Sequence, residues 1–443
     1  MKRVLIITYY WPPAGGGGVQ RWLKFVKYLP EYGWEPVVYT PENPEVPVLD
    51  ESLEKEVPKG VAVIRQRIWE PYSAYKLFTG KKERIQTAFL KEEQSRRRYL
   101  EGLSIWVRGN LFIPDARRFW IKPSVRFLAH YLGQHPVDAI VSTGPPHSMH
   151  LIGQKVSRKT GIPWVADFRD PWTNIDFYGQ LRLGKRADRK HHHLEEEVLR
   201  EAQAVTVVSP GMADEFRNKV TRDYPVIPNG FDAKDLEGLE KITPEPNRFV
   251  IAHIGSMTPS RNPRNLWKVL RSLCNENDSF SKQLKIRIIG KMDQAVAGGL
   301  KESGLESRVE NQPYLPHNEV VVAQRRAHVL LLVVNDTPNA KLILTGKLFE
   351  YLAARRPIVC IGPRNGDAAA VLRETGSGMT FGFDETGPLK DHILSLYLAS
   401  TKGKGSIKEG DISQYERRNL TRKMAQVLNS YTVSPQGSGS RNS

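Results

Sequence analysis

The chain has 443 residues, of which 40% are hydrophobic and 26% charged, a composition that is typical of globular proteins and excludes a disordered chain. Its two cysteines, Cys274 and Cys360, lie far apart, so we expect no disulfide framework and a reducing cytoplasm is the simplest setting. The formal net charge is +17, and the first 190 residues hold 31 Lys and Arg against 19 Asp and Glu. This excess permits nucleic acid, anionic lipid or phosphorylated substrates as partners and does not choose between them.

The first apolar run, residues 4–7, is too short for a signal peptide and is soon followed by polar residues. No stretch approaches the roughly 20 apolar residues of a membrane-spanning helix. We therefore expect a protein that is soluble or peripheral to a membrane.

A strand, a glycine turn, a helix and a second strand open the chain. Residues 4–8 form a buried apolar run, Gly15 to Gly18 follow, and apolar residues then recur at helical spacing to about Gly33. The sequence predicts the start of a doubly wound α/β domain, without the spaced glycines of the dinucleotide-binding pattern. Four consecutive glycines let the backbone pass close to a ligand, the alternative being a flexible turn that binds nothing.

A basic segment with interleaved aromatic residues, 81–118, is the least regular part of the N-terminal half. The pattern is typical of an amphipathic helix that lies on an anionic membrane surface. It is equally typical of the solvated face of a packed helix, and both interpretations stay open.

Polar residues follow two further predicted strands. His147 comes shortly after the strand at 138–142, and Arg169 and Asp170 come directly after the strand at 163–168. Open α/β sheets bind ligands at the carboxyl ends of their strands, so all three residues are candidates for a site. The alternative for Asp170 is a turn cap before Pro171.

Three consecutive histidines, residues 191–193, do not predict a metal site. Consecutive residues on a helix point about 100° apart and cannot converge on one ion. The chain also has no Asp-x-Asp element of the kind that holds a divalent ion beside a diphosphate. The sequence therefore predicts no metal ligands.

The stretch from Gly346 to Ile361 predicts a short helix and a buried strand. The amides around Gly346 and Lys347, with the positive end of the helix dipole, form a potential anion site. One turn later, the carboxylate of Glu350 can accept hydrogen bonds from a pair of sugar hydroxyls. A diphosphate beside a ribose fits both features, whereas an ordinary helix–strand unit would leave Glu350 solvated.

The sequence Gly-Lys-Leu-Phe-Glu-Tyr-Leu-Ala-Ala-Arg-Arg-Pro, residues 346–357, resembles the donor-binding signature of the retaining family-4 GT-B glycosyltransferases. That signature has two glutamates separated by seven residues, and Glu350 matches the second, which holds the donor ribose. Leu342 stands where the first should be. The resemblance implies an α/β, GT-B fold with two Rossmann-like, doubly wound parallel-sheet domains that face a central cleft.

The resemblance also implies which residues form the site. A Gly-Gly pair lies against the donor phosphate and acceptor, and a basic residue six positions after a strand-end glycine binds the diphosphate. The implied donor-binding residues are Gly17, Gly18, Gly255, Arg261, Gly346, Lys347, Leu348 and Glu350. The catalytic candidates are Asp170, His147, Arg169, Arg261 and Lys347.

The expected domain organisation follows from the same resemblance and from a polar, proline-containing linker. Residues 1–235 form the acceptor-side domain, 236–247 the linker and 248–410 the donor-binding domain. Helix 411–430 packs back on the first domain, and the Gly/Ser-rich tail 434–443 is expected to be disordered.

The expected reaction is glycosyl transfer, with retention, from a nucleotide-diphosphate sugar to the hydroxyl of a glycan or lipid-linked acceptor in envelope or exopolysaccharide synthesis. No cofactor is expected, and Arg261, Lys347 and backbone amides take the place of a metal. We expect a cytoplasmic enzyme, either free or peripheral at the inner face of the cell membrane. We expect it to bind no nucleic acid. One alternative is a nucleotide-sugar epimerase or hydrolase on a similar fold, and another is a basic protein that binds nucleic acid.

Overall fold

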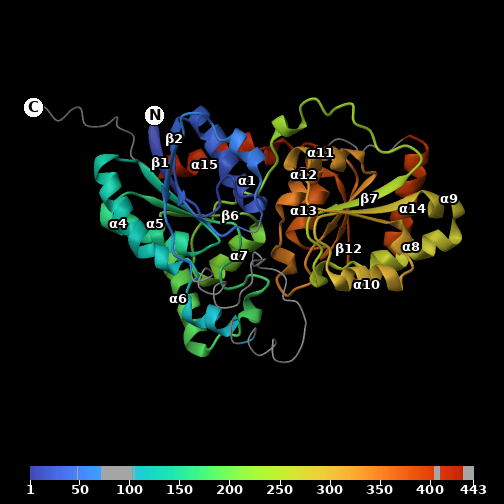
Figure 1. Cartoon of the computed structure of the whole chain (residues 1–443), viewed down its shortest axis with the longest axis horizontal. Coiled ribbons are helices and arrows are strands. Elements are labelled where there is room, and N and C mark those ends of the chain that lie inside the picture. Colours follow the sequence, from blue (N-terminus) through green and yellow to red (C-terminus); the bar gives the residue numbers. More distant parts are fainter. Residues whose placement is uncertain (47, 71–101, 103–104, 404–409, 433–443) are drawn as a thin grey trace, which may run out of the picture. The chain divides into compact units, whose positions relative to one another are not determined.

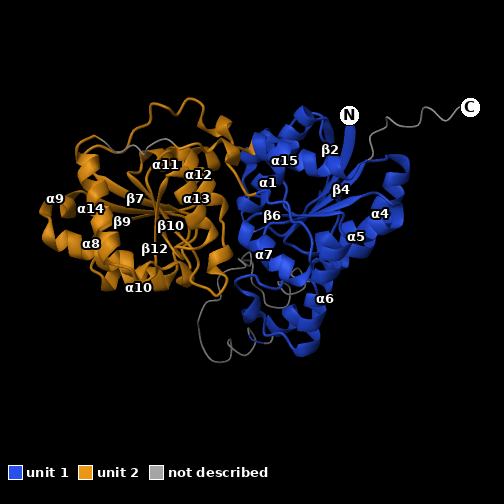
Figure 2. Ribbon diagram, turned by 180° about the vertical axis from the view of Figure 1, so that it is seen from behind, with its two compact units in different colours: residues 1–227, 418–443 blue, residues 228–417 orange. Residues whose placement is uncertain are grey.

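The computed structural model describes residues 1–46, 48–70, 102, 105–403 and 410–432. It divides into two compact units, Met1–Ile227 with Arg418–Ser443, and Pro228–Arg417 (Figure 2). In each unit, helices cover both faces of one parallel sheet (Figure 1). This is the doubly wound α/β architecture that the sequence predicts.

The N-terminal unit contains a six-stranded sheet with the order β3-β2-β1-β4-β5-β6. Its central strands are runs of apolar residues, and β4 is buried along its whole length, as expected of a parallel sheet covered on both faces. The strands are β1 (Lys2–Ile7), β2 (Trp34–Pro41), β3 (Ala62–Gln66), β4 (Ala139–Gly144), β5 (Trp164–Phe168) and β6 (Ala204–Val207). The helices are α1 (Gly17–Tyr28), α4 (Arg118–Gln134), α5 (Ser148–Thr160), α6 (Lys185–Glu201), α7 (Pro210–Lys219) and α15 (Arg417–Ser430).

The C-terminal unit contains a second six-stranded parallel sheet, with the order β12-β11-β10-β7-β8-β9. The strands are β7 (Phe249–Ile254), β8 (Leu284–Ile289), β9 (Val309–Gln312), β10 (Val329–Val333), β11 (Ile358–Ile361) and β12 (Gly378–Phe381). The helices are α8 (Arg264–Glu276), α9 (Asp278–Gln283), α10 (Gln294–Glu302), α11 (His317–Arg326), α12 (Gly346–Ala354), α13 (Asp367–Thr375) and α14 (Gly387–Thr401). Both sheets have the strand order of a Rossmann domain.

Each sheet reverses its winding at one place, between β1 and β4 in the first unit and between β7 and β10 in the second. Successive helices cross to opposite faces at such a switch point, which leaves a crevice at the carboxyl ends of the two strands. The topology therefore marks one candidate binding position in each unit.

The segment predicted as a linker is held to the C-terminal unit. Arg325 Nη1 donates to Leu239 O (3.0 Å), and Arg356 Nη2 donates to Ile242 O (3.0 Å). His317 Nε2 lies 2.9 Å from Asp235 Oδ2. Because these contacts fasten the segment to α11 and to the end of α12, the boundary between the units falls at Ile227.

The last helix belongs to the N-terminal unit, although α15 begins at Arg417 and not at Asp411. A short 3₁₀ turn, Ser413–Tyr415, precedes it. Leu420, Met424 and Leu428 of α15 are buried in the core that also contains strand residues of β1 and β4. This helix thus completes one side of the first sheet.

Two predictions concern residues that the structure leaves partly undescribed. In the basic segment 81–118, residues 81–101, 103 and 104 lie outside the described part, whereas residues 105–111 are helical. The tail 434–443 also lies outside it. Among the described residues, no helix combines the length and apolarity that crossing a membrane requires.

A buried carboxylate joins four elements of the first unit. Asp167, in β5, accepts two hydrogen bonds from Arg21 (3.0 and 2.7 Å) and one from Trp22 Nε1 (2.8 Å), both on α1. Thr143 of β4 and Thr206 of β6 donate their hydroxyls at 3.0 and 2.8 Å. Burial alone would raise the pKa of Asp167, but the Arg21 charge and these donors hold it at about 2.

Asp167→Asn should destabilise the protein strongly, because it leaves the guanidinium of Arg21 buried without its counter-charge. Breaking one side of such a pair costs about 3–5 kcal/mol, which corresponds to a loss of roughly 6–20 °C in the Tm of a unit this size. Scanning calorimetry is the measurement. The double variant Arg21→Met/Asp167→Leu should have a Tm closer to that of the wild type than Asp167→Asn has. A loss of Tm equal to the sum of the losses in Arg21→Met and Asp167→Leu would contradict this account.

Candidate functional site

The switch point of the C-terminal unit brings together Gly255 and Lys347. Gly255 directly follows β7 and has φ = 114°, a backbone conformation that favours glycine. A Cβ atom at this position would overlap the Lys347 side chain, whose Cε would lie 2.6 Å away. The glycine therefore makes the space through which the lysine side chain passes over the end of the strand.

Arg261 is fixed beside the same strand ends. It closes the 3₁₀ turn Pro259–Arg261, and its Nε donates to Asn335 Oδ1 (2.5 Å) just beyond β10. Its Nη1 donates to Ser256 O (3.3 Å), and the backbone of the turn accepts a hydrogen bond from Asp336 N (2.8 Å). Both sides of the switch point thus hold the guanidinium in place.

Lys347 and Arg261 place two cationic groups near the start of α12. Burial, followed by the positive charge of Arg261, lowers the pKa of Lys347 to about 7, although the carboxylate of Glu350 acts in the opposite direction. The first-turn amides of α12 add the positive end of a helix dipole. Thr345, which precedes the helix, has a shielded hydroxyl oxygen without a hydrogen-bond partner in the described part of the chain. This arrangement is suited to an anion.

Glu350 lies on α12 one turn after these groups and is half-buried. Gln324 Nε2 of α11 donates to its Oε2 at 3.4 Å, a long hydrogen bond that orients the carboxylate weakly. The other acceptor positions of the carboxylate are thus open to a pair of hydroxyls, at one helical turn from the anion site.

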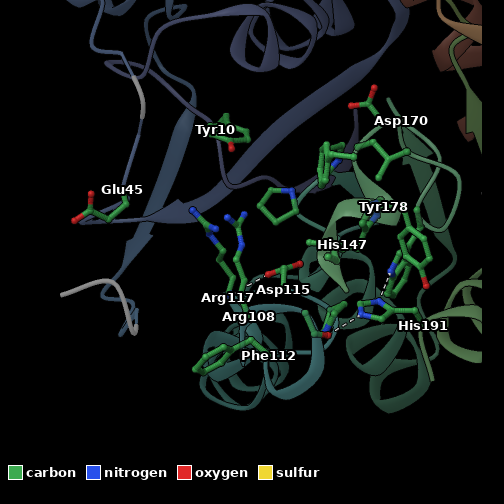
Figure 3. Close-up of a pocket in the computed structure, with 18 of the residues that line it drawn as sticks. Tyr10, Glu45, Arg108, Phe112, Asp115, Arg117, His147, Asp170, Tyr178 and His191 are labelled. Carbon is green, nitrogen blue, oxygen red and sulfur yellow. Dashed lines mark hydrogen bonds between the residues drawn. The ribbon is translucent and has the colours of Figure 1, made fainter. Parts of the chain in front are cut away.

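The N-terminal unit has a cavity of about 300 Å³ at the carboxyl ends of β1, β4 and β5 (Figure 3). Aromatic rings form much of its wall, including those of Tyr10, Phe112, Trp172, Phe177 and Tyr178. The charged residues that line it are Glu45, Arg108, Asp115, Arg117 and Asp170. Rings with a few polar groups between them are typical of a pocket for an organic ligand such as a sugar.

His147 is a buried, neutral member of this cavity. Its ring is stacked on the indole of Trp172, with a centroid distance of 4.6 Å and an interplanar angle of 2°. Burial and, to a smaller extent, the nearby His150 keep the pKa of His147 well below its usual value. At neutral pH the ring therefore has one N–H donor and one acceptor nitrogen, and the stack fixes the plane in which both lie.

A chain of hydrogen bonds orients His150 behind His147. Trp164 Nε1 donates to Ser142 Oγ (2.8 Å), which leaves the serine hydroxyl proton for His150 Nδ1, 2.9 Å away. His150 consequently carries its own proton on Nε2, and burial lowers its pKa to about 3. The ring is thus held neutral and in one tautomer.

Asp115 and Arg117 enter the site from the segment before α4. The carboxylate of Asp115 accepts hydrogen bonds from Ser148 N and Ser148 Oγ, both at 2.8 Å, and so caps the start of α5. Arg117 Nε lies 3.0 Å from Glu70 Oε1, and Arg117 Nη2 donates to Tyr9 Oη at 3.1 Å. These contacts tie the cavity wall to the end of β1.

The first part of the chain is similar to a known protein family. Residues 16–230 match the family model of the glycosyl transferase 4-like domain. The matched region contains Gly16 to Gly18, all the cavity-lining residues except Tyr10, and the Asp167 network, and it ends close to the boundary between the two units.

Solved structures resemble the whole chain. HepE from Anabaena, in complex with UDP-glucose, is 14% identical and aligns over 97% of this chain and 100% of its own, with a TM-score of 0.59. Sucrose-phosphate synthase from Thermosynechococcus elongatus is 13% identical over 98% and 95% (TM-score 0.57). WaaG, a glycosyltransferase involved in lipopolysaccharide biosynthesis, is 14% identical over 96% and 99% (TM-score 0.57). The likeness confirms the predicted GT-B fold; no curated protein matches the chain.

Within the matched region, Gly18, His147, Arg169 and Asp170 lie around the same strand ends. Arg169 donates to the carbonyl oxygens of Gly18 (2.8 Å), Gly144 (3.3 Å) and Pro145, so its guanidinium joins the glycine loop to β4. A Cβ at Gly18 would lie 2.9 Å from Arg169 Nη1, whereas a Cβ at Gly17 would meet nothing within 4 Å. Asp170 is exposed at the cavity.

In the second unit, Gly255, Arg261, Gly346, Lys347 and Glu350 gather at one strand-end region. Leu348 is different, because its side chain is fully buried in the core and leaves only its backbone for a ligand. In the first unit, His191 is buried, lines the cavity and accepts a hydrogen bond from Trp172 Nε1 (3.0 Å). Among the described residues, no group of three His, Cys, Asp or Glu side chains is placed to hold a metal ion.

The sequence analysis missed several residues of these sites, namely Asn335, Thr345, Asp115, Arg117, Trp172 and Asp167. Asn335 carried a usable signal, since it comes directly after a predicted apolar strand at the carboxyl edge of the sheet. The partners of Arg117 and Asp167 named above lie between 24 and 146 residues away in the chain, so no local pattern marks them.

Gly255→Ala should destabilise the second unit more than Gly376→Ala. Both glycines have positive φ, but a Cβ at Gly376 meets nothing within 4 Å, so that variant measures backbone strain alone, about 1–2 kcal/mol. At Gly255 the new methyl group also displaces Lys347, and we expect about 2 kcal/mol more. Thermal unfolding of the two variants gives the comparison. Equal losses in the free energy of unfolding would show that the Lys347 side chain does not depend on the space beside Gly255.

Proposed function

We propose that the chain is a glycosyltransferase that moves a glycosyl group from a nucleotide-diphosphate sugar to an acceptor hydroxyl with retention of anomeric configuration. The observation that carries this proposal is the pair of cations, Arg261 and Lys347, held at the start of α12 in a chain with a glycosyl transferase 4-like domain. Retention rests on the resemblance of residues 346–357 to the family-4 signature.

The donor diphosphate is assigned to the first-turn amides of α12 together with Lys347 and Arg261. A diphosphate supplies the negative counter-charge for these positively charged groups and helix amides. A guanidinium also suits a bidentate contact with a phosphate. Glu350, one turn away, then accepts hydrogen bonds from the ribose hydroxyls. HepE binds UDP-glucose, which makes UDP and its sugars the first ligands to examine.

The acceptor is assigned to the cavity of the N-terminal unit. Its aromatic rings give the apolar faces on which a sugar stacks, and its charged residues give hydrogen bonds to hydroxyls. His147 and Asp170 are the groups proposed to contact the reacting acceptor hydroxyl. WaaG acts in lipopolysaccharide biosynthesis, and we assign this chain by analogy to the synthesis of a cell-envelope or extracellular polysaccharide.

The leaving diphosphate is stabilised in this proposal by protein groups. Negative charge develops on it as the glycosidic bond breaks, and Arg261, Lys347 and the α12 amides are donors already fixed where that charge appears. Transfer should accordingly proceed without a divalent ion.

The experiment that tests the proposal is a turnover assay with nucleotide-sugar donors and glycan acceptors, in the presence of excess EDTA. Acceptor-dependent release of the nucleoside diphosphate, with retention seen by NMR of the product, is the expected result. Release of the diphosphate without acceptor, or a new nucleotide sugar in place of transfer, would favour the hydrolase or epimerase alternative. Activity that requires added Mg²⁺ or Mn²⁺ would contradict the metal-free leaving-group account alone.

Glu350→Gln should weaken binding of the nucleoside diphosphate by roughly ten- to a hundredfold. The charge-assisted hydrogen bonds to the ribose are worth about 1.5–3 kcal/mol, and the amide replaces only part of them. Calorimetric titration with UDP and other nucleoside diphosphates measures the change. Glu319→Gln, on the exposed surface of α11, is the matched control and should bind like the wild type. Equal affinities for the two variants would remove Glu350 from the site.

Binding of a nucleoside diphosphate should weaken as the pH rises above 7. The free Lys347 has a pKa of about 7, and a bound diphosphate favours its charged form, so the pKa in the complex is higher. Above pH 7 the empty site must take up a proton to bind, and Kd should rise roughly fiftyfold between pH 7 and pH 9. The terminal phosphate of the diphosphate loses its last proton at a pKa of about 6, so its own ionisation adds little to the dependence above pH 7.

Calorimetry in buffers of different ionisation enthalpy measures this proton uptake directly. Lys347→Met should bind more weakly and lose the pH dependence, whereas Lys341→Gln, an exposed lysine nearby in sequence, should keep it. A wild-type Kd that is constant from pH 7 to pH 9 would contradict the assignment of Lys347.

A further inference from the structure

The outer face of α4 carries two parallel rows of side chains. Residues 118, 122, 126 and 130 are Arg, Lys, Arg and His, and residues 119, 123, 127 and 131 are Phe, Pro, Phe and Tyr. Side chains four residues apart lie one above the other on a helix, so a basic row and an apolar row run side by side. The helix contains no acidic residue.

Unusually large apolar side chains are exposed along this face. Phe119 is 42% and Phe127 36% exposed, and the neighbouring Trp69 and Leu111 are 58% and 53% exposed. Trp69 and Phe119 are in edge-to-face contact, with ring centroids 4.8 Å apart. Arg118 Nη1 donates to Leu111 O, which places Leu111 beside the start of the helix. These residues, with Lys122 and Arg126, are called the α4 patch below.

The basic row destabilises its own helix. Like charges at i and i+4 cost a few tenths of a kcal/mol per pair. Arg118, Lys122 and Arg126 form no ion pair in the described part of the chain, so no carboxylate there offsets this repulsion. An anionic partner on the face of α4 would remove it.

The α4 patch adjoins the cavity of the N-terminal unit. Phe112, which lines the cavity, packs against Phe119 at a centroid distance of 5.9 Å. Figures 1 and 2 place α4 on the outside of its unit, with its inner face on the sheet and on α5. A surface that covered the patch would thus lie next to the mouth of the cavity.

We infer that the α4 patch docks the protein on a lipid bilayer that contains anionic lipid. Lys and Arg near such a surface gain from its negative potential, and aromatic side chains are favoured at the depth of the headgroups. Three cations that form no ion pair with the described residues lie beside four exposed apolar side chains, and together they match the charged and the apolar layer of that interface. The bilayer is favoured because the basic and apolar rows run in parallel along one helix, as they do in helices that lie in a membrane interface. Nucleic acid, which also combines cations with aromatic stacking, and a second protein molecule are outcomes of the test below.

The test is flotation of the full chain with vesicles of phosphatidylcholine alone or with 30% phosphatidylglycerol. Binding is expected with the anionic vesicles at 0.1 M salt, to fall at 0.5 M salt, and to be absent with neutral vesicles. In Arg118→Gln/Lys122→Gln/Arg126→Gln, the partition coefficient should fall about fivefold per charge, or about a hundredfold in total. The control Lys268→Gln/Arg271→Gln/Lys282→Gln removes three exposed charges from the other unit and should bind like the wild type.

A second measurement reports the apolar row. Bromolipids in the anionic vesicles should quench tryptophan fluorescence, and Trp69→Phe should lose part of that quenching. The melting temperature of the α4 triple variant should equal or exceed that of the wild type, because like-charge repulsion is removed. Flotation needs no turnover, so its outcome is independent of the proposed glycosyl transfer.

Three outcomes would overturn the inference. The first is no binding of the wild type to anionic vesicles at low salt. The second is an equal loss in the α4 and control triple variants, which would show a response to net charge alone. The third is that the wild type does not bind vesicles but either forms a dimer in sedimentation velocity or is retained on heparin, and that the α4 triple variant loses this property.

Discussion

The buried carboxylate of Asp167 is the interaction on which the first unit depends. It holds Arg21 and Trp22, which follow the glycine loop, against the threonines of β4 and β6. Thr143 directly precedes Gly144, whose carbonyl oxygen accepts a hydrogen bond from Arg169. The same network therefore sets the register between the glycine loop and the strand ends around the cavity, so its loss would affect the site as well as stability.

The two sheets share one strand order, yet the chemistry at their switch points differs. The second unit gathers cations and helix amides at the end of β7, an environment for a phosphate group. The first unit gathers aromatic rings and two neutral histidines at the end of β4, an environment for hydroxyl groups. Topology fixes where each site lies, and a few side chains just beyond the strand ends decide what it can bind.

Local sequence patterns were sufficient to predict strands of the two sheets. They were insufficient to predict the hydrogen-bond networks between distant residues. The apolar run 358–361 coincides with β11, and the run 249–254, which is apolar except for His253, coincides with β7, because buried parallel strands need apolar residues on both faces. The sequence did not predict α4, whose interior Pro123 and exposed aromatic residues obscure the helical period. Lys347 and Glu350 could be proposed from the sequence because they share one short helix with the candidate anion site. The cavity was not predicted, since its walls come from six separate segments of the chain.

The N-terminal unit is discontinuous in sequence, and this affects the order in which the protein is made. Leu420, Met424 and Leu428 of α15 fill part of the core of the first sheet. A ribosome releases them only after all of residues 228–417, so the first sheet must wait with an uncovered apolar surface while the second unit emerges. Domains generally fold as units during synthesis, the N-terminal one first. Here the contiguous second unit is able to finish earlier, and the nascent first unit is the part that needs protection from aggregation.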